Sequence, residues 1–208
     1  MLSSGLAHAA GIEWRARRST LHLLALIGAV AICGAISTVQ LPSFQEDTMP
    51  GAPQHLAYGF LYAPVLLAPI IAHWLVDPFA GLTTTVTTRL RRTRLAWTIG
   101  LLALMLLSAS IVAMIARTSD ALAVTCENTL LAFALLVGLR PFLAPEWAAL
   151  IVIGYGTVGL FAPDLGLLMI NREPRVTDAV MGIGLTGVEL WLIACGNPLA
   201  WRRASTAA

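Results

Sequence analysis

The feature that most constrains this chain is a series of long apolar runs separated by short polar segments. The first run, residues 20–41, contains no Asp, Glu, Lys or Arg. At about 22 residues it is long enough for an α-helix to cross about 30 Å of hydrocarbon. Only 12% of the residues are charged, whereas a soluble domain of this size has about twice that fraction. The sequence therefore predicts an all-α polytopic integral membrane protein.

Six apolar runs of this kind predict a single six-helix transmembrane domain over residues 20–203. We expect the spans at about 20–41, 57–76, 95–116, 123–139, 147–161 and 179–199. A secretory signal also begins with positive charge, but the first run is longer than a signal core and no small-residue cleavage site stands out at its end. We therefore expect it to be retained, with residues 1–19 as a cytosolic or interfacial segment and residues 204–208 as a tail.

The arginines indicate the orientation of these spans. Three precede the first span, four lie between spans two and three, one follows span four and two close the chain, so the six-span topology places ten of thirteen arginines on one side. Because arginines near span ends are retained in the cytosol, we expect both termini there, in the cytoplasmic (inner) membrane.

The segment between spans two and three, residues 77–94, combines basic and apolar residues. Apolar side chains recur at steps of three and four, which predicts one face of a short amphipathic helix: Phe79, Leu82, Val86 and Leu90. Its arginines are Arg89, Arg91, Arg92 and Arg94. Asp77 and Pro78 resemble an N-cap followed by proline at the first helical position. We expect this helix to lie at the cytosolic surface of the membrane.

Two stretches match the pattern G-x-G-x-x-G inside predicted spans. They are Gly154, Gly156 and Gly159 in span five, and Gly182, Gly184 and Gly187 in span six. A dinucleotide site needs this pattern at a turn from strand to helix, whereas glycines within spans allow helix backbones to approach closely. Helix packing is the better interpretation, with spans five and six in tight contact with each other or with a second copy.

Glu189 is the one acidic residue well inside a predicted span. A carboxylate in hydrocarbon costs about 2.5 to 3.5 kcal/mol, so this side chain must face protein or water or carry a proton. An interhelical hydrogen bond and a place on a substrate or proton path are both open interpretations. Before span six, residues 162–178 include an apolar run too short to cross, which predicts an outer, partly inserted segment.

Several classes of chemistry lack support in the sequence. The chain has no Lys, so it cannot carry a standard phosphate-binding P-loop, and its arginines follow span ends rather than a nucleic-acid-binding pattern. No catalytic motif is present, and we expect no metal site and no cofactor bound by this chain. The three cysteines form no CxxC pair and are interpreted as buried thiols rather than metal or redox groups.

Residues 66–104 carry a resemblance to a known family. An apolar span is followed by Asp77, Gly81, a threonine-rich turn at 83–85 and the arginines at 89–94, which lead directly into the next span. Together with six spans and an apolar outer segment before the last, this pattern resembles the membrane (permease) subunit of an ATP-binding-cassette transporter of the ABC-2 type.

The resemblance implies a function and partners. The 77–94 segment would be the coupling helix that docks on a separate nucleotide-binding ATPase subunit, with ATP and Mg²⁺ bound there and no enzymatic step on this chain. A second permease subunit, identical or related, would complete the complex in the lipid bilayer, with no nucleic acid. The expected function is export of an amphipathic or hydrophobic substrate: a drug, a peptide antibiotic or a lipid-like molecule. The alternative is a small integral membrane accessory, immunity or lipid-modifying protein with no ATPase partner.

Overall fold

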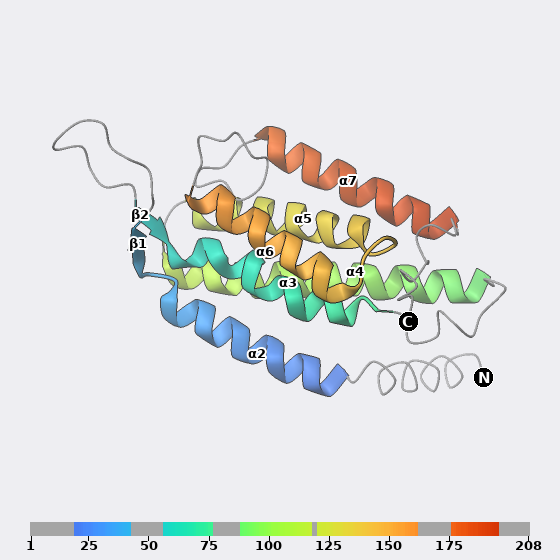
Figure 1. The fold of residues 1–208 in the computed structure, drawn as a ribbon, viewed down its shortest axis with the longest axis horizontal. Coiled ribbons are helices and arrows are strands. Elements are labelled where there is room, and N and C mark those ends of the chain that lie inside the picture. The colour runs from blue at the N-terminus through green and yellow to red at the C-terminus, as the bar shows by residue number, and fades with distance from the viewer. Residues whose placement is uncertain (1–18, 43–55, 77–87, 118–119, 162–175, 196–208) are drawn as a thin grey trace.

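The described part of the chain is a bundle of helices with one short strand pair (Figure 1). The computed structural model describes residues 19–42, 56–76, 88–117, 120–161 and 176–195. Its helices are α2 (Ser19–Ile36), α3 (Ala63–Trp74), α4 (Thr88–Ala116), α5 (Ala121–Leu139), α6 (Pro145–Phe161) and α7 (Val176–Cys195). Strands β1 (Gln40–Pro42) and β2 (Leu56–Tyr58) pair antiparallel, with Gln40 opposite Tyr58, and the short 3-10 helix η1 (Gly59–Tyr62) leads into α3. The predicted all-α class is confirmed.

Each of the six predicted spans contains a helix, but the bounds of the first two differ from the prediction. Helix α2 ends at Ile36, so the end of span one lies in β1, and the start of span two lies in β2. Four helices, α2, α4, α5 and α7, are long and apolar enough to cross a membrane. The other two are shorter, since η1 and α3 together cover Gly59–Trp74 and α6 has 17 residues. These lengths identify a helical membrane protein, while six complete crossings remain a prediction. Of the predicted outer segment 162–178, residues 162–175 lie outside the described residues and the rest form the first turn of α7.

The helices lie side by side along the long axis of the molecule, with α2 and α7 on opposite flanks of the other four (Figure 1). Helix α3 packs against α2, α4, α5 and α6, and most of its side chains are buried. On the other side α7 packs against α5 and α4. The core therefore centres on α3 and α5, and each flanking helix has one face against the bundle and one face open.

The open faces of the two flanking helices are apolar. Leu24 on α2 is 62% exposed and Trp191 on α7 is 63% exposed, and each has further exposed aliphatic neighbours on the same helix. In water such a surface would be costly, because each square ångström of apolar area left exposed forfeits about 25 cal/mol. A helix that is apolar on every side suits contact with lipid. These faces identify the sides of the bundle that meet the bilayer or another protein.

Hydroxyl groups within the helices bond to their own backbone. Thr98 Oγ1 donates to the Arg94 carbonyl at 3.0 Å, and Thr129 Oγ1 donates to the Thr125 carbonyl at 2.6 Å. Thr157 Oγ1 likewise donates to the Ile153 carbonyl at 2.7 Å. Because each acceptor lies four residues earlier in the same helix, these hydroxyls need no partner from lipid.

Helix α4 joins the basic segment to the third predicted span without a break. The span was expected to begin at residue 95, but the helix begins at Thr88. Its 29 residues reach about 43 Å, which exceeds the hydrocarbon thickness by about 13 Å. Residues 88–94 are thus the first turns of α4 rather than the end of a separate helix. Residues 77–87 of the predicted amphipathic helix lie outside the described residues.

Gly59 closes the end of the bundle where α2 meets the strand pair. Its amide donates to the Val39 carbonyl at 2.9 Å. A Cβ atom at this position would overlap the Ile36 carbonyl at the end of α2. The backbone can approach so closely only because the residue has no side chain.

Candidate functional site

The polar groups that bear on function lie at the two ends of the bundle and along the contact between α5 and α7. At one end, aromatic residues tie α2, α3 and α4 together. The indole Nε1 of Trp74 donates to Ser19 Oγ at 3.1 Å, and that of Trp97 donates to the Trp74 carbonyl at 3.2 Å. The His22 ring stacks on Trp74 with ring centroids 5.7 Å apart. This end of the bundle is therefore firmly connected across three helices.

The arginines predicted to couple to a partner lie at this same end. Arg91 Nη1 donates to the Cys195 carbonyl at 3.4 Å, which links the start of α4 to the end of α7. Arg92 is exposed on the first turns of α4, and Arg89 and Leu90 belong to the same turns. The other three predicted coupling residues, Phe79, Leu82 and Val86, lie outside the described residues.

Helices α5 and α7 meet along a seam of small and polar residues. A Cβ atom at Gly138 of α5 would lie 2.7 Å from Glu189 Oε1, so the Glu189 carboxyl group occupies the space that this glycine leaves. Thr186 is buried one turn earlier on α7. Glu189 Oε2 and Thr186 Oγ1 have no hydrogen-bond partner among the described residues. The seam therefore has polar groups available for a ligand, a proton or water.

The glycines of the two predicted packing motifs have different surroundings. Gly182 lies against α5, where an added Cβ would be 3.1 Å from Leu130 Cβ. Gly154, Gly184 and Gly187 have nothing within 4 Å of an added Cβ. Gly156 and Gly159 are both buried on α6.

The expected close contact between spans five and six is not the main packing of these helices. Helix α7 packs chiefly on α5, and α6 packs chiefly on α3. The reason is the order of the bundle, in which α5 lies between the two glycine-bearing helices. Contact of the open glycines with a second copy stays a prediction.

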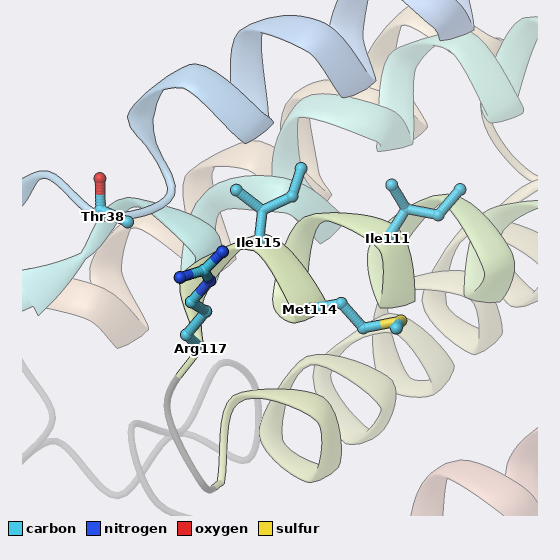
Figure 2. Close-up of a pocket in the computed structure, with 5 residues that line it drawn as sticks. All are labelled: Thr38, Ile111, Met114, Ile115 and Arg117. Atoms are coloured by element: carbon cyan, nitrogen blue, oxygen red, sulfur yellow. The ribbon is translucent and has the colours of Figure 1, made fainter.

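A pocket opens at the opposite end of the bundle, where α2 and α4 end. Its volume is about 670 Å³. The lining combines aliphatic and thioether side chains with one guanidinium and one hydroxyl group: Thr38, Ile111, Met114, Ile115 and Arg117. Figure 2 shows the guanidinium of Arg117 extending toward the space between Thr38 and Ile115, with Ile111 and Met114 farther along α4. Such a lining can take a ligand with an anionic group and an apolar part.

The sequence did not predict this pocket. Arg117 was expected in the turn after the third span, whereas Thr38, 79 positions earlier, was expected inside the first span. One available signal was an arginine on the side that the arginine distribution assigns to the exterior. The pairing of the two helix ends required the three-dimensional arrangement.

The described residues include no metal-binding cluster, and the three cysteines differ in their exposure. No group of three His, Cys, Asp or Glu side chains among them is placed to hold a metal ion. Cys33 is buried, the Sγ atom of Cys126 lies 3.7 Å from Ser110 Oγ, and Cys195 is exposed. The expectation that all three thiols are buried is therefore wrong for Cys195.

Comparison of the chain with protein-family models, curated proteins and solved structures gives no match.

Proposed function

We propose that the chain crosses the cytoplasmic membrane six times, with both termini in the cytosol, and serves as the membrane subunit of an ATP-driven exporter. The proposal is supported first by the charge distribution. Arg91, Arg92 and Arg94 begin α4, and Arg140 follows α5 at the same end of the bundle, whereas Arg117 lies at the other end. This distribution agrees with an arginine-rich cytosolic side.

The observation that carries the proposal is the continuity of α4. The helix runs unbroken from the arginine cluster into the bundle and packs against α2, α3, α5 and α7. A force applied to its first turns by a cytosolic partner would therefore reach four of the other helices directly. We expect the partner to be an ATPase subunit that binds ATP and Mg²⁺, because this chain has no P-loop lysine.

In this mechanism the chain makes and breaks no covalent bond. Closure of the partner ATPases around ATP displaces the 77–94 segment and the start of α4, and the helices shift against one another to open a path for the substrate. That path includes the α5–α7 seam, where Glu189 Oε2 and Thr186 Oγ1 are buried without a hydrogen-bond partner among the described residues. Apolar walls around one carboxyl group suit an amphipathic or hydrophobic substrate, carried by two permease subunits together.

Copurification tests the proposal. A tagged chain, expressed with its neighbouring genes and extracted in mild detergent, should retain a nucleotide-binding subunit through purification. If no such subunit is retained, and no adjacent reading frame encodes a P-loop, the exporter proposal fails and a membrane protein without an ATPase replaces it.

Substitution tests the coupling segment. The double variant Leu82→Asp/Val86→Asp should uncouple ATP hydrolysis from transport without preventing insertion. The matched control Thr84→Asp/Thr88→Asp has the same charge and spacing two positions along, on the opposite side of the predicted helix. Equal transport by the two double variants would rule out docking through the apolar face.

A further inference from the structure

The pocket at the end of α2 and α4 has a chemical composition that the exporter mechanism does not use. Ile111, Met114 and Ile115 are 43%, 71% and 46% exposed, so an apolar strip leads along the last two turns of α4. Arg117 follows directly after the helix end and is itself exposed. Ile111 and Arg117 are six residues apart, or about 9 Å along the axis. The cationic group therefore stands at one end of an apolar strip several methylene groups long.

Arg117 also has an unusual backbone. Its φ of 56° is in the left-handed region, and it is the one non-glycine residue with positive φ among the described residues. A residue other than Gly, Asn or Asp is disfavoured there, and such positions gather at ligand sites. This conformation ends α4 and leaves the guanidinium beside Thr38 rather than continuing the helix (Figure 2).

We propose that this pocket binds one anionic phospholipid from the leaflet at this end of the bundle. The phosphate accepts hydrogen bonds from the Arg117 guanidinium, whose planar fork matches phosphate oxygens, and from the Thr38 hydroxyl. An acyl chain lies along Ile111, Met114 and Ile115. The proposal depends on the membrane insertion of α2 and α4 and not on an ATPase partner.

The lining favours a phospholipid over a free anion or a purely apolar ligand. Three of its five side chains are apolar, which a hydrated phosphate ion would leave uncovered. A hydrocarbon ligand would in turn leave the guanidinium without an anion, and no carboxylate of the described residues forms an ion pair with Arg117. A lipid satisfies both halves of the pocket with one molecule.

The test is native mass spectrometry of the intact chain in nonionic detergent, with phosphatidylglycerol or phosphatidylcholine of identical acyl chains added. We expect the wild type to bind one phosphatidylglycerol about tenfold more tightly than phosphatidylcholine, as a charge-assisted hydrogen bond would give. Arg117→Gln should lower phosphatidylglycerol binding to the level of phosphatidylcholine. Arg92→Gln, which removes an exposed arginine at the other end, is the matched control and should leave the preference unchanged.

Three results would overturn the proposal: a preference retained in Arg117→Gln, a preference lost in Arg92→Gln, or displacement of the lipid by inorganic phosphate alone. Met114→Glu provides a second variant should Arg117→Gln not fold, because Met114 is exposed and its replacement disturbs no core contact. The added carboxylate should weaken phosphatidylglycerol binding selectively. Equal loss of both lipids, or no loss, would contradict a phosphate at Arg117.

Discussion

The α5–α7 seam makes a quantitative prediction through Gly182. A Cβ atom there would lie 3.1 Å from Leu130 Cβ, which is bonded directly to the backbone of α5 and cannot rotate aside. In Gly182→Ala the two helices must therefore separate by a few tenths of an ångström. Overpacking of this kind costs about 1–3 kcal/mol, and the better helix propensity of alanine offsets about 1 kcal/mol of it. We expect a net destabilisation of about 1 kcal/mol.

Gly184→Ala is the matched control for that substitution. It changes the same residue type two positions along the same helix, where nothing lies within 4 Å of an added Cβ. Because the added methyl group meets no neighbouring atom, Gly184→Ala should leave stability unchanged or raise it by up to about 1 kcal/mol. Leucine at the two positions should widen the difference, because a longer side chain at 182 must wedge the helices apart.

Reversible unfolding in mixed micelles, followed by circular dichroism, measures both variants against the wild type. The prediction is that Gly182→Ala unfolds at a lower denaturant fraction and Gly184→Ala does not. Equal stability of the two alanine variants, or of the two leucine variants, would refute the packing of α7 on α5 through Gly182.

Three further substitutions test other contacts by the same unfolding assay. Gly59→Ala should destabilise by more than about 3 kcal/mol, because its Cβ would overlap the last carbonyl of α2; near-wild-type stability would contradict that approach. Ser19→Ala removes the acceptor of the Trp74 indole at 3.1 Å and should cost about 1 kcal/mol, with Ser19→Thr as the control that keeps an oxygen. Gly138→Ala should lower the stability less than Gly182→Ala does, because the atom nearest its added Cβ is the flexible end of the Glu189 side chain. Adding Glu189→Gln, which has the same size, should not change this loss of stability.

Much of the fold followed from the apolar runs. Each run became a helix because the backbone in an apolar environment must satisfy its hydrogen bonds internally, and a helix does so within one segment. The break at Pro141 and Pro145 likewise separates α5 from α6. The start of α4 was not foreseen, because arginine is a good helix former and hydropathy alone marks only where the apolar part begins.

The arrangement of the helices was beyond the sequence pattern. The glycines of α6 and α7 indicated close helix packing but not which helix each would pack against. Gly182 packs against α5 rather than α6. Glu189 was singled out as an acidic residue inside a predicted span, yet the space beside it comes from Gly138, a residue with no signal of its own. The lipid pocket joins residues from two helix ends, which only the order of packing brings together.

The most direct test of the central claim is the sidedness of the two ends of the bundle. In a chain with Cys33, Cys126 and Cys195 replaced by alanine, single cysteines are introduced as Glu146→Cys and Thr38→Cys, both at exposed positions. Intact cells are then treated with a membrane-impermeant maleimide. The account predicts that Thr38→Cys is labelled from outside and that Glu146→Cys is labelled only after the membrane is opened. Labelling of Glu146→Cys in intact cells, or of both positions from the same side, would contradict it.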